Sequence, residues 1–346
     1  MTLRDTPRPD RLRITVIGLY VLLAAANIGA WLWALAAFHD HPALLGSASL
    51  AYSFGLRHAF DADHIAAIDN ATRKLMIEGR RPVSVGLWFS LGHSTVVVGL
   101  SLLIAATTAA LQNRFDGLKD VGSLIGTSVS AAFLFIIAAA NLVVLTGVWR
   151  TFQEVRRGGP LVEEDIDRIM AGRGLLVRLF RPVFGIIGRS WHMYPLGLLF
   201  GLGFDTATEV GLLGISATSA SQGLSVWTIL IFPALFTAGM TLLDTTDSVL
   251  MVGAYSWAYS KPLRKLYYNM TITLVSVVVA VLVGGIEALN LAADRLKLEG
   301  TFWNGIGALN DDFGVLGLVI VGLFAVSWAV SVAIYRARGY DDAKVA

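Results

Sequence analysis

Eight segments of this 346-residue chain are apolar over about the 20 residues that a helix needs to cross a bilayer. Hydrophobic residues make up 55% of the chain, charged residues only 15%, and mean hydropathy is +0.66, which is more apolar surface than one soluble core would bury. We therefore expect an all-α, polytopic membrane protein, with residues 1–346 forming a single integral membrane domain of eight transmembrane helices. The expected spans cover about 14–37, 45–68, 84–108, 124–149, 192–217, 226–256, 268–292 and 314–335.

The Lys and Arg residues are distributed in a way that predicts the topology. Of the 27, all but five lie in the N-terminal segment, the even-numbered loops or the C-terminal segment, and cytoplasmic flanks are enriched in such residues. We expect both termini and an insertion over about 150–190 to be cytoplasmic. The second half of that insertion suits either a helix lying on an anionic leaflet or a plain connector. The basic residues then serve topology and do not indicate nucleic-acid binding.

A cluster of ionisable residues lies in the second apolar segment, where residues 57–69 read RHAFDADHIAAID. An ionisable side chain at mid-bilayer costs at least about 2.5 kcal/mol, so the cluster indicates an ion or proton site. The chain has no cysteine, which excludes thiolate sites and leaves imidazole, carboxylate, backbone and thioether groups as metal ligands. The candidate residues are Arg57, His58, Asp61, Asp63, His64 and Asp69.

Helical geometry selects some members of this cluster. On a regular helix of about 100° per residue, His58, Asp61 and His64 fall within an arc of about 120° and could bind a cation from one face. Asp63 points about 140° away from His58, so its participation requires a kink, an unwound turn or a neighbouring helix. The alternative is structural: Arg57 pairs with Asp61 at i,i+4, and the imidazoles form hydrogen bonds within the bundle.

Other predicted spans contribute further ligand-type residues. The third span carries His93 beside Ser94, the fifth carries Asp205 and Glu209, and the sixth carries Asp244 and Asp247. Two carboxylates on one helix face repel each other in a low dielectric unless a cation lies near them or one is protonated. We expect a cation path through these residues; the alternative is that the acidic pairs are protonated or bonded to neighbouring threonines.

Short sequence similarities predict an inverted repeat. FGLRHAFDAD at 54–63 resembles FGLGFDTATE at 200–209, and FSLGHST at 89–95 resembles FTAGMTL at 236–242. The matched helices are the second with the fifth and the third with the sixth. An offset of three spans places the two halves in opposite orientations, which is an architecture of alternating access with a binding site near the midplane.

Four motifs carry a resemblance to a known family. In order, RHAFDADHI, LGHSTVV, LGFDTATE and GMTLLDTTD resemble the signature motifs of the bacterial nickel/cobalt transporter (NiCoT) permeases. The resemblance implies uptake of Ni²⁺, Co²⁺ or both across the cytoplasmic (inner) membrane, with the metal as substrate, no resident cofactor and no enzyme activity. The metal-recognising residues that it implies are His58, Asp63, His64 and His93. It thus favours Asp63, whereas the geometry of a regular helix favours Asp61.

The energetics of uptake require no ATPase subunit. A divalent cation gains about 4.6 kcal/mol per 100 mV on moving down an inside-negative potential, so uniport and ion-coupled transport are both compatible with the sequence. The chain also has no GxxxxGK[ST] phosphate loop. Because metal binds neutral imidazole, with a reference pKa near 6.5, we expect weaker uptake below about pH 6.

Two other functions compete with transport. An intramembrane metalloprotease would ordinarily need an HExxH pair, whereas the residues after His58 are AFDADH. A membrane metal sensor would bind the ion without moving it, and uptake into sealed vesicles would separate the two. The sequence ranks neither nickel against cobalt nor one oligomeric state against another.

Overall fold

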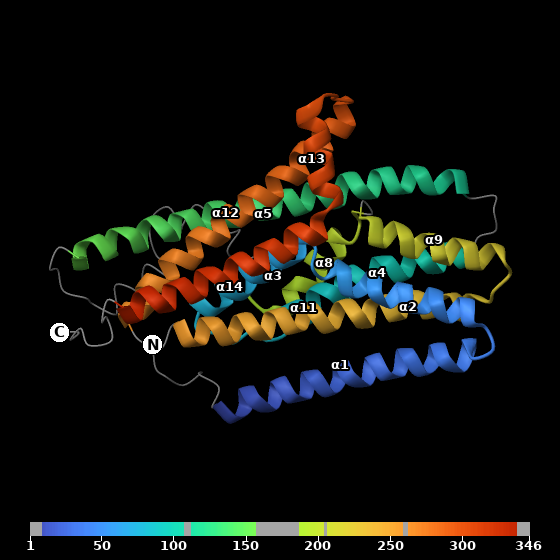
Figure 1. Cartoon of the computed structure of the whole chain (residues 1–346), viewed down its shortest axis with the longest axis horizontal. Helices are drawn as coiled ribbons and strands as arrows, with labels where there is room; N and C mark the ends of the chain where they lie inside the picture. The colour runs from blue at the N-terminus through green and yellow to red at the C-terminus, as the bar shows by residue number, and fades with distance from the viewer. Residues whose placement is uncertain (1–8, 107–111, 157–186, 204–205, 259–261, 338–346) are drawn as a thin grey trace.

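The structure is a computed structural model that describes residues 9–106, 112–156, 187–203, 206–258 and 262–337. Over these residues the regular elements are all helical (Figure 1). They are α1 (Pro9–Phe38), α2 (Pro42–His58), α3 (Ala62–Ile77), α4 (Val85–Ala106), α5 (Gln112–Arg156), α8 (Met193–Phe200), α9 (Ala207–Ser221), α10 (Val226–Ile229), α11 (Ile231–Ala258), α12 (Pro262–Leu296), α13 (Thr301–Asp311) and α14 (Phe313–Ala337), with a 3-10 turn at Ser190–His192.

Most of the helices lie roughly side by side along the long axis of the molecule, and α12 crosses them at a tilt (Figure 1). In the same view α1 begins and α14 ends toward the same end of the bundle. This arrangement suits a bundle whose axis runs through a membrane, because helices satisfy their own backbone hydrogen bonds in lipid.

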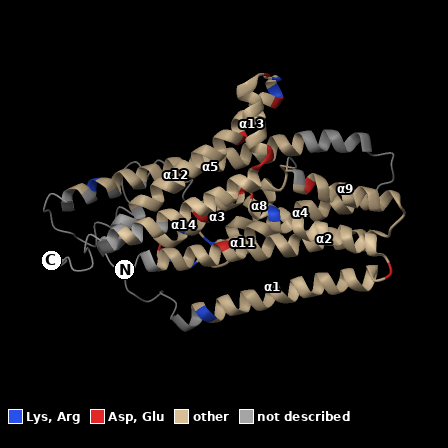
Figure 2. Ribbon diagram, in the orientation of Figure 1, with Lys and Arg blue, Asp and Glu red and all other residues tan. Residues whose placement is uncertain are grey.

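Five described helical segments are long and apolar enough to span a membrane, and a sixth candidate is the α13–α14 pair, bent by 75°. Figure 2 shows few charged residues along the lengths of the helices. The outer surface is rich in large apolar side chains, as expected for a surface in contact with lipid. On α1 these are Ile14, Ile17, Val21, Leu22, Ile28, Leu32, Trp33 and Leu35. The chain is therefore a multi-pass membrane protein, as predicted.

The second and fifth predicted spans are not continuous helices. The span expected at 45–68 is divided into α2 and α3 by residues 59–61. In the span expected at 192–217, α8 ends at Phe200 and α9 begins at Ala207, and the described residues 201–203 and 206 between them are not helical. A kink or unwound turn in the second span was one of the alternatives that the sequence left open for Asp63, whereas the break in the fifth span was not predicted. Hydropathy averaged over the length of a span does not resolve a break of a few residues.

Local sequence explains where the second half of each broken span begins. Asp61 precedes α3 in an extended conformation with φ −64° and ψ 142°, and Thr206 precedes α9 with φ −84° and ψ 141°. Asp and Thr are favoured at these N-cap positions because their side chains accept hydrogen bonds from free backbone N–H groups. Thr206 does so from the N–H of Glu209, whereas Asp61 makes no such bond. The Asp61 carboxylate is thus free for another role.

Two further features differ from, or extend, the prediction. The helix α13 was not predicted; it follows Gly300, whose φ of 125° is readily adopted only by glycine, and it bends sharply into α14. In the expected insertion over 150–190, α5 continues to Arg156, while residues 157–186 lie outside the described part of the chain.

Packing brings the broken helices into the centre of the bundle. The first halves of the two broken spans pack on different partners, α2 on α11 and α8 on α4, while α4 and α11 also pack on each other. The large aromatic side chains Phe89 on α4 and Phe232 and Phe236 on α11 are fully buried there. Both breaks therefore lie close to the α4–α11 contact.

Candidate metal site

Three imidazoles from three helices meet in the bundle interior. The ring centroids of His58, His64 and His93 are 4.6 to 4.9 Å apart. Each side chain is at most 3% exposed, and one nitrogen from each lies within 4.8 Å of the others. Within the described residues this is the one group of three or more His or acidic side chains arranged to hold a metal ion. The structure therefore brings the three predicted membrane-embedded histidines together.

The break in the second span positions two of these imidazoles. His58 is the last residue of α2 and His64 lies in the first turn of α3, so the turn at 59–61 separates them. His93 comes from the middle of α4, and its Nε2 lies 3.0 Å from His58 Nε2. The site is thus built from the two ends of a break and a continuous neighbouring helix.

Glu209 completes the cluster from the other broken span. Its side chain is fully buried, and Oε1 lies 2.8 Å from His93 Nε2 and 3.9 Å from His58 Nε2. The other oxygen, Oε2, accepts a hydrogen bond of 2.9 Å from the Thr206 hydroxyl. Thr206 and Glu209 form a T-x-x-E pair at the start of α9, in the spacing of a capping box. This pairing holds the carboxylate so that Oε1 faces the imidazoles.

Asp61 and Asp63 lie on either side of the start of α3. Asp61 Oδ2 is 2.6 Å from His58 Nδ1, and the residue is 3% exposed. Asp63 has one buried oxygen, Oδ1, with no hydrogen-bond partner among the described residues. Arg57 also lies near Asp61, since Arg57 Nε and Asp61 Oδ1 are the two atoms nearest to a Cβ placed on Gly314, so their pairing stays a prediction. The other oxygen of Asp61 approaches an imidazole.

Asp244 extends the site onto α11. Its Oδ2 lies 3.2 Å from His64 Nδ1 and 2.9 Å from Ser90 Oγ. On the other side of the cluster, Thr208 Oγ1 lies 3.2 Å from His58 Nδ1. Hydroxyl groups therefore orient both an imidazole and a carboxylate of the site.

Several ligand-type atoms of the cluster are buried without a hydrogen-bond partner in the described structure. They are His64 Nε2, His93 Nδ1, Asp63 Oδ1 and Asp244 Oδ1. A buried polar atom without a partner is costly, and buried carboxylates are costly without a counter-charge. A cation among these groups would offset both costs. Nitrogen and oxygen donors without thiolate suit divalent metals such as Ni²⁺ and Co²⁺.

A second polar cluster surrounds Asp69, one to two turns farther along α3. Asp69 accepts hydrogen bonds from Tyr255 on α11 and, at 2.8 Å, from Ser276 on α12. Arg73, one turn on, is 1% exposed and donates to Thr273 of α12 at 2.6 Å. Asp69 thus links α3 to α11 and α12 through hydrogen bonds, and its described hydrogen bonds do not involve the imidazoles.

Replacement of Ser276 by alanine is expected to destabilise the protein by about 1–3 kcal/mol, because Asp69 Oδ2 then loses the Ser276 hydroxyl as its hydrogen-bond donor in a buried environment. Thermal unfolding of the purified protein in detergent would measure the loss. Ser53→Ala is the matched control, since the exposed Ser53 hydroxyl bonds only to a carbonyl of its own helix. Equal unfolding temperatures for the two variants would contradict a structural role for Asp69.

The remaining predicted residues are distributed around the site. Ser94 is buried beside His93, and its Oγ has no hydrogen-bond partner among described residues. Asp247 has a buried, unpartnered Oδ2 and interacts electrostatically with Asp69 and Asp244, which places it between the two clusters. Asp205 lies outside the described residues.

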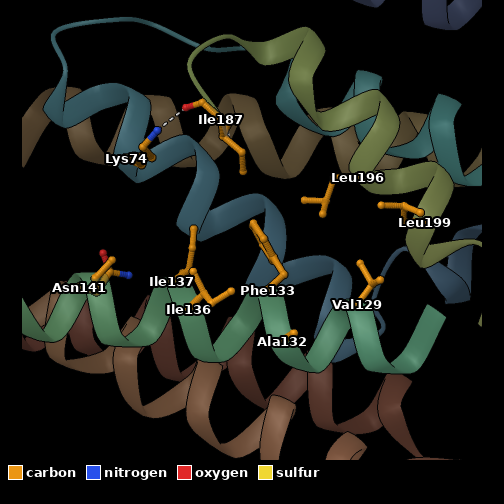
Figure 3. Close-up of a pocket in the computed structure, with 11 residues that line it drawn as sticks. Lys74, Val129, Ala132, Phe133, Ile136, Ile137, Asn141, Ile187, Leu196 and Leu199 are labelled. Carbon is orange, nitrogen blue, oxygen red and sulfur yellow. Dashed lines mark hydrogen bonds between the residues drawn. The ribbon is translucent and has the colours of Figure 1, made fainter. Parts of the chain in front are cut away.

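An apolar cavity of about 280 Å³ lies apart from these clusters, between α5, α8 and the end of α3 (Figure 3). Lys74 and Asn141 are the only polar side chains in its lining, and Lys74 Nζ donates to the carbonyl of Ile187. The lining contains neither imidazole nor carboxylate, so this cavity is unsuited to a metal ion.

Comparison with known proteins identifies the family. The sequence profile of NicO, described as high-affinity nickel-transport protein, matches residues 44–334. The chain belongs to the NicO family. This family is one of transporters and not of enzymes, which agrees with the predicted resemblance and excludes the protease as the family function.

Curated relatives named as nickel or cobalt transporters cover 84% or more of this chain. It is 64% identical over 343 residues to the high-affinity nickel transport protein of Cupriavidus necator, covering 99% of this chain and 97% of that protein. It is 49% identical over 296 residues to the nickel transporter NicT of Mycobacterium tuberculosis, covering 84% and 79%. It is 41% identical over 329 residues to the cobalt transport protein NhlF of Rhodococcus rhodochrous, covering 93% and 92%. No solved structure matches the chain.

The structure places three residues of this chain in closer contact with the site than the sequence predicted. Glu209 was expected to line a path, yet it contacts His93 in the centre of the cluster. Ser90 and Thr208 were not assigned to the site, although both contact it. One signal was available: the T-x-x-E spacing of Thr206 and Glu209 is typical of a helix start. It predicts a break in the fifth span.

Proposed function

We propose that this chain is a secondary transporter that takes up Ni²⁺, Co²⁺ or both across the bacterial cytoplasmic membrane. One observation carries the proposal: three buried imidazoles and a carboxylate converge at the breaks of two helices, in a chain that belongs to a nickel-transport family. Its relatives include proteins named as nickel transporters and one named as a cobalt transporter. Ionisable groups inside a membrane protein are costly and mark ion pathways.

The proposed ligands are the imidazoles of His58, His64 and His93 and the carboxylate of Glu209. Asp61 Oδ2, 2.6 Å from His58 Nδ1, orients that ring or joins the metal from the other side. Asp63 and Asp244 supply further carboxylates near the site. This arrangement supports an ion that sheds its water and binds to nitrogen and oxygen donors from four helices.

We further propose eight transmembrane spans within one membrane domain, with both termini cytoplasmic. Two spans are the broken pairs α2–α3 and α8–α9, whose polar breaks keep their halves below the length and apolarity of a single spanning helix. Broken helices at membrane depth are tolerated where they line a site inside the protein. The clustering of Lys and Arg in the even-numbered loops supports this orientation.

Matching close contacts support the inverted repeat. A Cβ atom on Gly55 of α2 would lie 2.1 Å from the carbonyl oxygen of Phe236 on α11, and one on Gly197 of α8 would lie 2.0 Å from that of Phe89 on α4. Phe89 and Phe236 are already equivalent in the predicted repeat. These contacts favour aligning YSFGL at 52–56 with YPLGL at 194–198, four residues from the predicted match of Gly55 with Gly201.

Both breaks lie in the first helix of each proposed repeat, where alternating access places the binding site. Relative movement of the repeats would expose the cluster first outward and then inward. The inside-negative potential supplies about 4.6 kcal/mol per 100 mV for a divalent cation, so neither ATP nor an ATPase subunit is required.

Uptake into sealed vesicles tests this proposal. We expect proteoliposomes that contain the purified chain to accumulate radiolabelled Ni²⁺ with saturation kinetics, faster when a K⁺ diffusion potential makes the inside negative. Protein-free vesicles are the control, and competition by unlabelled Co²⁺, Zn²⁺ and Mn²⁺ ranks the metals. Binding without time-dependent, ionophore-releasable accumulation would identify a sensor and overturn the proposal.

A further inference from the structure

The last helix, α14, contacts the break in the second span. Gly314 and Gly317 lie in its first turns and are spaced as G-x-x-G. A Cβ atom on Gly317 would lie 1.5 Å from the carbonyl oxygen of Phe60. A Cβ atom on Gly314 would lie 3.2 Å from Arg57 Nε and 3.3 Å from Asp61 Oδ1. Both glycines therefore touch the segment that separates His58 from His64.

The contact at Gly317 is a backbone contact. Real Cβ atoms do not approach a carbonyl oxygen to 1.5 Å, so any larger residue at 317 displaces either α14 or the Phe60 peptide group. The contact at Gly314 is milder, because its neighbours are side-chain atoms at 3.2 Å or more. We therefore expect a larger residue at 317 to displace the turn strongly, and one at 314 to displace the same turn slightly.

The turn has few restraints of its own. The Phe60 N–H donates to the Arg57 carbonyl at 3.0 Å and the Asp61 N–H donates to the His58 carbonyl at 2.9 Å, but Asp61 then adopts an extended conformation without a side-chain cap. Its carboxylate instead lies 2.6 Å from His58 Nδ1. External packing must therefore hold the turn, and α14 supplies it directly on the Phe60 peptide.

We propose that α14 is a positioning element of the metal site, in which Gly314 and Gly317 allow the helix to close on the turn at 59–61 and hold Asp61 against His58. This inference rests on the proposed transport function and deepens it. The motifs that predicted the site lie in the second, third, fifth and sixth spans, so α14 is an additional contributor. Small changes at this contact alter the arrangement of ligands, and hence metal affinity.

A set of glycine variants on one helix tests the proposal. Gly317→Ala is expected to raise the KM of Ni²⁺ uptake in proteoliposomes by about tenfold, the size of effect that follows loss of a group that orients a metal ligand. Gly314→Ala is expected to raise it by less than about tenfold, because its side-chain neighbours at 3.2 Å or more can move. Gly322→Ala is the matched control: the residue is exposed on α14 and nothing lies within 4 Å of its added Cβ.

A spectroscopic readout separates positioning from general damage. The visible absorption spectrum of Co²⁺ bound to the purified protein reports ligand geometry, so we expect it to change for Gly317→Ala and to stay as in the wild type for Gly322→Ala. All three variants gain the same helix propensity from Gly to Ala, which removes that effect from the comparison. Size-exclusion elution in detergent shows which variants are folded.

The possible outcomes distinguish this inference from the proposed function. Failure of the wild type to accumulate Ni²⁺ refutes the proposed function itself. If the wild type transports and folded Gly317→Ala matches Gly322→Ala in KM and Co²⁺ spectrum, α14 does not position the site. If Gly317→Ala does not fold, Gly314→Ala decides: an unchanged KM and spectrum there overturn the inference.

Discussion

Replacement of His93 by alanine is expected to lower the rate of saturable Ni²⁺ uptake at limiting metal by at least about tenfold, the lower bound set by loss of even an outer-shell partner of a metal site. His93 Nε2 lies 3.0 Å from His58 Nε2 and 2.8 Å from Glu209 Oε1, so its ring links the second span to the fifth. Its removal takes away one nitrogen ligand and leaves the Glu209 carboxylate without its imidazole partner. Initial rates of radiolabelled Ni²⁺ uptake in proteoliposomes would measure the effect.

The control for this variant is His39→Ala. The His39 side chain is 69% exposed and lies beside Asp40 after the end of α1, remote from the cluster in the fold. Both variants replace a histidine by alanine, which makes them a matched pair. Because His39 lies away from the cluster, we expect His39→Ala to take up Ni²⁺ at the wild-type rate. Wild-type uptake by His93→Ala at limiting metal, with comparable protein incorporation, would show that the imidazole cluster is not the transport site.

Sequence patterns predicted the outer framework of the fold more closely than its interior. The first and last spans were expected at about 14–37 and 314–335, and α1 and α14 cover Pro9–Phe38 and Phe313–Ala337. Such spans are determined by local hydropathy, because lipid accepts any sufficiently long apolar helix. The Phe60 carbonyl in the break at residues 59–61 contacts Gly317 of α14, which is distant in sequence, and a local pattern does not contain such a contact.

In the candidate site, too, some residues could be identified from the local sequence, whereas their contacts depend on packing between distant segments. His58, His64 and His93 were identifiable because imidazoles are rare and costly in apolar spans. Glu209 was identifiable as an intramembrane acid, but its contact with His93 depends on two helix breaks meeting at the α4–α11 contact. The geometry of a regular helix favoured Asp61, because Asp63 points away from His58 on such a helix. The turn at 59–61 removes that restriction, so the geometric argument against Asp63 no longer applies.

Replacement of Glu209 by glutamine is expected to raise the KM for Ni²⁺ uptake by at least about tenfold. Glutamine keeps the size of the side chain and one oxygen, but it removes the negative charge 2.8 Å from His93 Nε2. The charge matters because a divalent cation in a buried site needs anionic ligands or neighbours to offset the loss of its water. Uptake kinetics, together with the Co²⁺ absorption spectrum of the purified protein, would report affinity and ligand geometry separately.

Glu78→Gln provides the matched control. Glu78 lies at the end of α3, with its side chain 35% exposed and paired with Lys74 at 3.4 Å, so loss of its charge should leave the KM unchanged. Asp61→Asn and Asp63→Asn complete the comparison, since each removes one carboxylate charge from the turn beside the imidazoles. A KM raised by both Asp variants but not by Glu209→Gln would locate the anionic ligands on α3 and its preceding turn. The fifth span would then contribute only packing, and the site would lie within one half of the proposed repeat.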